Sequence, residues 1–564
     1  MPELSPGQPP PDHYYADNLI ALVEGVRQQY GDILTAEEAE FGEGIVAMPA
    51  SSQRLLARLM SRKGPLVRVD SLNFREIDDT SAALGYLVAE GFVARCPEAP
   101  AAALARLLTR VELAQCFGDA LAPGGESAAT ENGSCSGAPG ADSGRSASAP
   151  PRRSDARKRD YLEWIERGLT DAEVHRRIER DFPWVALDRV ERLDLYRLLF
   201  FGDRRRDLST FVLRDLGLSR YPEYELARER RLFADRAALD AYRALIGLGD
   251  HIDELGARPP ADAAVPALET LWQPFGNRLF ERRRSRMLNR LGRGLERVGE
   301  FDAALACYAR SSMPPARERR VRILKRLLDT HAVERLRRRM RERPICPQEA
   351  DFAARFGTRR SRAWPRETVV LNVPDIEHVE AAAAAVLTAD EGCAWHIENA
   401  LPMGLFGLAY WDWVFAPVDG MFVNAFQTAP IDLFWPDFLE ARRGLCPDPL
   451  DSDDETLRAS LLETCRTHRG VANRLVDWGV FDEDTLSQLL EGLGADTVRK
   501  LVGFAGEDLD NARRGFPDLT VVYGPGRFEF VEVKGPNDRL RDDQYLWIER
   551  LQEADLPVRV ARCR

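Results

Sequence analysis

The sequence predicts a multidomain protein that is mainly α-helical and carries a smaller α/β domain at its C-terminal end. Its 564 residues are several times the roughly 100–200 residues of one domain. Apolar residues recur at helical spacing through most of the chain, whereas residues 515–564 show the alternation that is typical of strands. A composition of 45% hydrophobic and 30% charged residues is that of a globular protein able to bury sizeable cores.

The composition also excludes several classes of protein. No apolar run reaches the roughly 18–20 residues of a membrane-spanning helix, and the first residues are polar and rich in proline, so we expect neither a membrane span nor secretion. The nine cysteines are scattered without a Cys-x-x-Cys pair, which indicates neither a disulfide framework nor a zinc–thiolate site. We therefore expect a cytoplasmic protein.

The net charge of −12 argues against a protein that is basic throughout, but it hides two arginine-rich segments. Arg278–Arg297 contains eight basic and two acidic residues, and Arg317–Arg343 contains twelve basic and four acidic ones. Such segments either bind phosphate groups or are solvated helix faces, and the charge pattern leaves both interpretations open. Together with two arginines near the C-terminal site, the candidate DNA-binding residues are Arg282, Arg283, Arg286, Arg337, Arg338, Arg339, Arg513 and Arg514.

Residues 1–95 are predicted to form a winged-helix-like domain. Pro65–Val69 is a short extended stretch within a helical pattern, and the apolar residues from Ile77 to Val88 mark an amphipathic helix that ends at Gly91. A simple helical bundle would show the same periodicity, so that alternative stays open.

Residues 96–250 form a second predicted region, interrupted by a low-complexity insert. In Leu121–Pro150, 22 of 30 residues are Gly, Ala, Ser or Pro, which is too little apolar surface to offset the entropy of ordering. We expect this insert to be disordered. From Arg152 to about Asp250 the pattern is helical and includes a linker.

Residues 251–366 are predicted to form a helical domain of the tetratricopeptide type. Small and aromatic residues in Leu291–Arg310, such as Gly292 and Tyr308, are spaced as in one helix–turn–helix repeat. The signature is partial and occurs once.

The last predicted domain covers residues 367–564. It begins with a β-branched strand at Thr368–Val373 and an alanine-rich helix at Ile376–Leu387. The apolar run His396–Phe415 is predicted to be a helix that carries Glu398 near its start, where a carboxylate also suits the helix dipole. We expect His396 to be structural, because magnesium-type sites prefer oxygen ligands.

The C-terminal segment is predicted to have the order β-β-α-β. Two strands, Asp518–Tyr523 and Arg527–Lys534, are joined by the turn Gly524–Gly526. Asp538 is placed to cap the following helix, and Leu556–Ala561 is the last strand. One stripe of that helix is formed by Leu540, Gln544, Trp547 and Leu551.

Two carboxylates and a lysine are predicted to meet in this hairpin. Glu532 and Lys534 point to the same face of their strand, and pairing across the turn brings Asp518 near Glu532. Carboxylate oxygens of this kind suit Mg²⁺ or Mn²⁺, and a neighbouring lysine can position a water or stabilise developing phosphate charge. A surface hairpin with a salt-bridged Glu and Lys is the alternative.

These residues carry a resemblance to a known family. Pro517-Asp518, the run Glu532–Asp538 and the pair Gln544 and Trp547 resemble the VRR-NUC domain of PD-(D/E)xK nucleases, and more narrowly the Fanconi-associated nuclease family. Further similar segments are Met60–Leu72, Glu76–Val93, Leu108–Leu113 (the start of a SAP domain), Leu208–Tyr224 (a linker), Leu291–Tyr308 and His396–Phe415. The chain is identified as resembling a bacterial member.

The resemblance implies winged-helix-like, SAP-like and tetratricopeptide-like modules followed by an α/β, restriction-endonuclease-like VRR-NUC domain. It implies that Glu398, Asp518, Glu532 and the Val533 carbonyl bind Mg²⁺ or Mn²⁺, that Lys534 is the catalytic lysine, and that Gln544 orients the site. No Cys/His cluster is available for the ubiquitin-binding zinc finger of eukaryotic members.

The activity implied by the resemblance is incision near 5′ flaps and 5′-to-3′ trimming, in repair of lesions such as interstrand crosslinks, with branched or flapped DNA as the partner. Two alternatives stay open: a Holliday-junction-type resolvase and a non-catalytic DNA-repair scaffold.

Overall fold

The computed structural model describes residues 14–62, 64–117, 157–204, 220–358 and 363–564. These residues fall into two compact units, residues 1–218 and residues 219–564, each described here by itself. The predicted insert Leu121–Pro150 and most of the linker Leu208–Tyr224 lie outside the described residues. Within the described residues, no helix is both long and apolar enough to cross a membrane.

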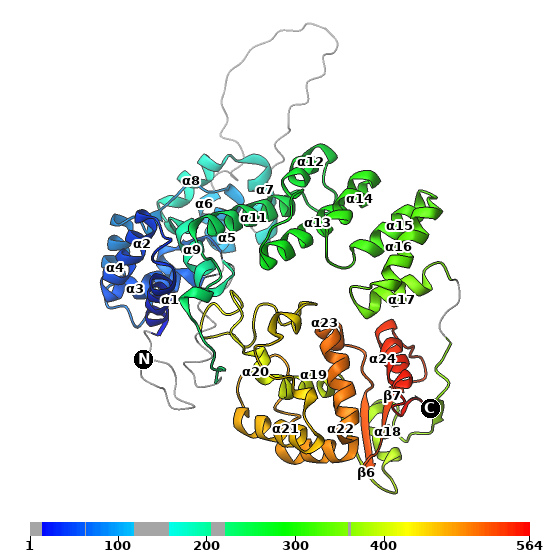
Figure 1. Ribbon diagram of the computed structural model, residues 1–564. Helices are drawn as coiled ribbons and strands as arrows, with labels where there is room; N and C mark the ends of the chain where they lie inside the picture. The colour runs from blue at the N-terminus through cyan, green and yellow to red at the C-terminus, as the bar shows by residue number, and fades with distance from the viewer. Residues whose placement is uncertain (1–13, 63, 118–156, 205–219, 359–362) are drawn as a thin grey trace, which may run out of the picture. The chain divides into compact units, whose positions relative to one another are not determined.

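The N-terminal unit consists mainly of helices (Figure 1) and contains a small antiparallel sheet. Its strand order is β1-β3-β2, so that the strands Leu66–Arg68 (β1) and Val93–Arg95 (β2) pair only through Trp184–Leu187 (β3). The helices of this unit are α1 Tyr14–Tyr30, α2 Ala36–Ala47, α3 Ala50–Met60, α4 Thr80–Ala89, α5 Ala101–Leu107, α6 Arg110–Phe117, α7 Lys158–Gly168, α8 Asp171–Glu179 and α9 Val190–Phe201.

Two sequence predictions are corrected in this unit. The helix expected from Ile77 is α4, which begins only at Thr80, because the Asp79 side chain accepts a hydrogen bond from the Ala82 amide and so caps the helix there. The region after Arg152 is not helical throughout, since β3 interrupts it and joins the two strands of the preceding segment.

The C-terminal unit begins with a run of antiparallel helices (Figure 1). The expected helix–turn–helix is confirmed as α13 and α14, which are separated at Gly299 with φ 92° and pack against each other. Gly292 allows this packing, because a Cβ there would lie 3.0 Å from the Tyr308 ring. The helices of this run are α11 Arg236–Glu254, α12 Ala261–Thr270, α13 Arg278–Val298, α14 Phe301–Arg310, α15 Ala316–Arg326, α16 Thr330–Glu342 and α17 Pro347–Arg355.

A five-stranded mixed sheet follows, with the order β4-β8-β7-β6-β5. The pairs β4–β8 and β8–β7 are parallel, whereas β7–β6 and β6–β5 are antiparallel. The last strand in the sequence therefore lies between the first strand and the hairpin. The strands are β4 Thr368–Leu371, β5 Cys393–His396, β6 Leu519–Gly524, β7 Arg527–Lys534 and β8 Val558–Cys563.

Helices cover both faces of this sheet. On one face, α18 (Val379–Leu387) packs on small and β-branched side chains of the central strands. On the other face, a larger core joins the sheet to α19, α22 and α24. The remaining helices are α19 Ala400–Ala409, α20 Trp411–Val414, α21 Asp454–His468, α22 Glu483–Glu507, α23 Leu509–Ala512 and α24 Asp542–Glu553. The predicted order β-β-α-β at the C-terminal end is confirmed.

Candidate active site

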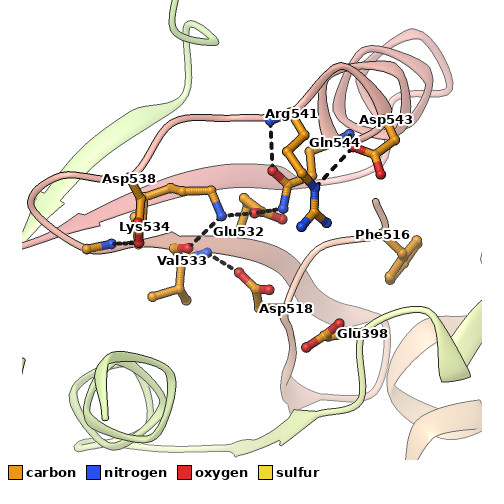
Figure 2. Close-up of polar contacts among 12 residues, drawn as sticks. Glu398, Phe516, Asp518, Glu532, Val533, Lys534, Asp538, Arg541, Asp543 and Gln544 are labelled. Carbon is orange, nitrogen blue, oxygen red and sulfur yellow. Dashed lines mark hydrogen bonds and ion pairs between the residues drawn. The ribbon is translucent and has the colours of Figure 1, made fainter. Parts of the chain in front are cut away.

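Strand β7 places Glu532 and Lys534 on the same face of the sheet, as their spacing predicts. Glu532 is fully buried and Lys534 is 8% exposed. The Lys534 ammonium donates hydrogen bonds to Glu532 Oε1 and, at 3.0 Å, to the Val533 carbonyl (Figure 2). The lysine is therefore held against both the carboxylate and the main-chain oxygen that the family resemblance implies as ligands.

Helix α24 brings a further donor to Glu532. Gln544 Nε2 donates to Glu532 Oε1 at 2.5 Å, and Gln544 Oε1 accepts from the Arg541 amide at 3.0 Å (Figure 2). The helix begins after Arg541, so the expected cap at Asp538 is wrong. Asp538 instead accepts a hydrogen bond from the Gly535 amide at 3.0 Å and closes the turn after the strand. Gln544 thus orients Glu532 from the first turn of the helix.

Asp518 lies directly before β6 and opposite the end of β7. Its Oδ2 accepts a hydrogen bond from the Val533 amide at 2.7 Å. The pairing of Leu519 with Val531 confirms the expected approach of this carboxylate to Glu532. In Figure 2, Asp518 lies between Glu532 and Glu398.

Burial raises the pKa of both Glu532 and Asp518. Burial raises the pKa of Glu532 to about 8, and the charge of Asp518 adds to this, while Lys534 opposes it. Burial also raises the pKa of Asp518, to which the charge of Glu398 contributes. The buried Glu532 and the partly buried Asp518 beside one ammonium leave an excess of negative charge that a cation would neutralise.

Glu398 comes from a turn and not from the predicted helix. The run His396–Phe415 divides into the end of β5, a turn, α19 and α20, and Glu398 has φ 40° in that turn. Its amide donates to the Asp518 carbonyl at 3.4 Å, which ties the turn to the hairpin. Its side chain is 48% exposed, and its Oε1 lies 3.1 Å from His396 Nε2.

The segment before Asp518 contacts both this turn and helix α24. The Asn399 side chain accepts a hydrogen bond from the Phe516 amide at 3.0 Å, and the Phe516 ring packs edge-on against Trp547 at 5.0 Å. Gly515 has φ 84°, and a Cβ there would lie 2.5 Å from the Asp543 carbonyl carbon. The segment before Asp518 therefore packs directly on the first turn of α24.

The residues present fit a divalent cation. Glu532 Oε2 is buried and has no hydrogen-bond partner among the described residues, so it is an acceptor that a cation would satisfy. Ligand atoms of His396, Glu398 and Asp518 all lie within 4.8 Å of one another. The structure thus brings Asp518, Glu532, the Val533 carbonyl and Lys534 together, with Glu398 on the solvent-accessible side.

The arginines predicted on α13 divide into two kinds. The Arg282 guanidinium lies over Trp435 at 5.1 Å, and burial lowers the pKa of Arg282 to about 10. Arg283 lies over Tyr242 at 5.5 Å, so these two side chains contribute to packing. Arg286 is exposed.

The other predicted arginines divide in the same way. On α16, Arg337 donates to the Ala353 carbonyl at 3.0 Å, whereas Arg338 and Arg339 are exposed. Near the site, Arg513 lies over Phe434 at 4.3 Å, and Arg514 is exposed.

Some residues around the site were not among the sequence candidates. Arg541 lowers the pKa of Glu532 through its charge, and Asn399 holds the loop before Asp518. A sequence signal could have found both residues, because each is next to a feature that the sequence shows. Arg541 precedes the acidic start of a helix, and Asn399 follows Glu398. Glu380 of α18 raises the pKa of Asp518 from the other face, and nothing in the sequence placed it there.

Comparisons with known proteins identify the family. The family model for the VRR-NUC domain matches residues 452–564, and the one for the FAN1 HTH domain matches residues 13–94. A Fanconi-associated nuclease 1 homolog of Pseudomonas aeruginosa is 31% identical over 598 residues, covering 100% of this chain and 98% of that protein. The chain belongs to the Fanconi-associated nuclease family.

Relatives and solved structures agree with this membership. An Arabidopsis thaliana homolog is 25% identical, covering 99% of this chain and 67% of that protein. The crystal structure of paFAN1 bound to 2nt 5′ flap DNA with a gap matches with a TM-score of 0.82 and 30% identity over 99% of each chain. The expected family, the multidomain fold with its C-terminal nuclease domain, and the identity as a DNA nuclease are thereby confirmed.

Proposed function

We propose that this protein hydrolyses phosphodiester bonds in 5′-flap DNA, by endonucleolytic incision and 5′-to-3′ trimming, with Mg²⁺ or Mn²⁺ as the cofactor. The observation that carries this proposal is the meeting of Asp518, Glu532 and Lys534 at the end of one hairpin, with Glu532 Oε2 unpaired. The paFAN1 structure on flap DNA, a close match over the whole chain, supports the choice of substrate.

Each residue has a distinct role in this proposal. Glu398, Asp518, Glu532 and the Val533 carbonyl hold the cation, which when bound polarises the scissile phosphate and makes a water more acidic. Lys534 is close enough to the carboxylate and carbonyl ligands to donate a hydrogen bond to a phosphate oxygen or to a water beside them.

Gln544 is a positioning residue. Its amide nitrogen fixes Glu532 Oε1, and Oε2 is left without a hydrogen-bond partner among the described residues. Its own carbonyl oxygen is held by the Arg541 amide, so the side chain cannot turn away without breaking the start of α24.

The exposed arginines bind the phosphate groups of the DNA backbone. Arg286, Arg338, Arg339 and Arg514 present charge to solvent, where phosphate contacts position a duplex without reading its sequence. Such contacts suit a substrate that is defined by its shape. A role in interstrand-crosslink repair and a cytoplasmic, nucleoid-associated location complete the proposal, and the free cysteines of the described residues fit a reducing compartment.

A cleavage assay on a panel of branched DNAs tests this function. The full chain is incubated with 5′-flap, splayed-arm and four-way DNA in Mg²⁺, in Mn²⁺ or in EDTA. We expect cleavage of the 5′ flap with either cation and none in EDTA. Symmetric cleavage of the four-way DNA alone would indicate a resolvase instead, and binding without cleavage under all conditions would indicate a scaffold.

A further inference from the structure

His396 takes no part in the proposed reaction, yet it lies at the same end of the sheet as two proposed ligands. It is the last residue of β5 and pairs with Leu519, the residue that follows Asp518. The turn that carries Glu398 begins directly after it. The register of β5 against β6 therefore fixes the imidazole close to both carboxylates.

The distances in this group match those around a single cation. His396 Nε2 lies 3.1 Å from Glu398 Oε1, and ligand atoms of His396, Glu398 and Asp518 lie within 4.8 Å of one another. Two ligand atoms on opposite sides of a cation, at bond lengths of about 2.1–2.4 Å, are about 4.2–4.8 Å apart. All three atoms can thus contact one cation without a change in the backbone.

The chemistry of this group differs from that of the buried side of the site. Around Glu532, the atoms that we propose as cation ligands are all oxygen atoms. The exposed side adds a ring nitrogen, which Mg²⁺ accepts poorly and transition-metal cations such as Mn²⁺ accept readily. A nitrogen here would distinguish between the two cations that the carboxylates alone accept.

We propose that His396 is a nitrogen ligand of the cation held by Glu398 and Asp518, and that it makes the site bind Mn²⁺ in preference to Mg²⁺. This inference rests on the proposed function, because it uses the two carboxylates assigned there. In this arrangement the half-exposed imidazole of His396 contacts the cation directly.

The chain offers a matched control for an ordinary surface ion pair. His378 Nδ1 lies 3.1 Å from Asp375 Oδ2, the same separation as between His396 and Glu398. The His378 side chain is 75% exposed and none of its ligand atoms joins the group around Asp518. His378→Gln therefore removes a comparable pair without touching the site.

The test uses Mn²⁺ alone with the full chain. Bound Mn²⁺ is titrated by electron paramagnetic resonance, and pulsed measurements detect nitrogen coupled to it, with ¹⁵N-histidine labelling to assign the nitrogen. We expect histidine coupling in the unmodified protein and in His378→Gln, and its loss in His396→Gln. We also expect His396→Gln to weaken Mn²⁺ binding about tenfold with little effect on Mg²⁺ competition binding.

Each outcome bears on the inference separately from the cleavage assay. Mn²⁺ that binds without histidine coupling, or coupling that persists in His396→Gln, would overturn the inference, while flap cleavage in Mg²⁺ would leave the proposed function standing. Equal loss of Mn²⁺ and Mg²⁺ affinity in His396→Gln would overturn the selectivity. Asp518→Asn should remove bound Mn²⁺ altogether, and unchanged Mn²⁺ binding in that variant would contradict the proposed function as well.

Discussion

The two glutamates on either side of Asp518 lie in opposite surroundings. Glu532 is on a central strand, fully buried, and held by Lys534 and Gln544. Glu398 is on a turn, with about half of its side chain exposed. The strand side keeps its geometry through packing, whereas the turn side faces the solvent from which a cation and DNA arrive. A site built in this way combines fixed ligands with an accessible entrance.

The largest effect is expected on the buried side. Glu532→Gln and Lys534→Ala should each lower single-turnover cleavage of a 5′ flap by about a thousandfold or more, because no water can take the place of a buried charge. Binding to flap DNA in the presence of Ca²⁺, measured by fluorescence anisotropy, should stay nearly unchanged. Lys500→Ala, which removes an ammonium paired with Asp496 on α22, serves as the control. Full activity in both Glu532→Gln and Lys534→Ala would contradict the assignment of these residues to the active site.

A smaller effect is expected on the exposed side. Glu398→Gln should lower the same cleavage rate by about tenfold to a hundredfold, since water can enter and replace part of this ligand. Raising the Mn²⁺ concentration should restore part of the rate in this variant and none in Glu532→Gln. Equal losses of cleavage rate in Glu398→Gln and Glu532→Gln would show that burial does not determine how strongly each ligand affects the rate.

The pH dependence of stability should report on the buried side. In the metal-free protein the pKa of Glu532 is raised to about 8, so the folded state binds more protons than the unfolded state between roughly pH 4.5 and pH 8. The free energy of unfolding should therefore decrease as the pH rises through this range.

Denaturant unfolding in EDTA from pH 5 to pH 8 measures this decrease. We expect a smaller decrease in Glu532→Gln than in the unmodified protein. The same decrease in both proteins would place its cause elsewhere.

The smallest effect concerns the arginines of α16. Arg338→Gln with Arg339→Gln should weaken flap binding severalfold and reduce the salt dependence of log K by about one per lost phosphate contact. Arg337→Gln should instead lower stability, because its guanidinium holds the Ala353 carbonyl of α17. Arg443→Gln, an exposed arginine paired with Glu440, is the control. An unchanged salt dependence in the double variant would show that this face does not contact DNA.

The buried side could be predicted from sequence because its information is local. The alternation of side chains around Glu532 and Lys534 predicts the strand, and the Gly-Pro pair after them predicts where it ends. The structure confirms this strand as β7. The turn at Glu398 could not be predicted, since the apolar run that follows it continues without a break and resembles one helix from His396 onward. The strand that precedes the turn is defined by its pairing with β6, which comes more than a hundred residues later in the chain.

Distance in the sequence also explains the other errors. β3 is short and its partners are far away, so periodicity alone could not find it. Arg337 and Arg338 are neighbours of the same type, and the sequence does not distinguish them. In the structure Arg337 donates to a carbonyl of α17, whereas Arg338 is exposed. The cap at Asp538 was misplaced because a loop separates that residue from α24.

The position of β8 between β4 and β7 has a consequence for the order in which the sheet is completed. While the chain is still emerging from the ribosome, β7 lacks its parallel neighbour and β4 has no strand to pair with. The strand that carries Glu532 and Lys534 therefore becomes a central strand only after Val558–Cys563 has been translated.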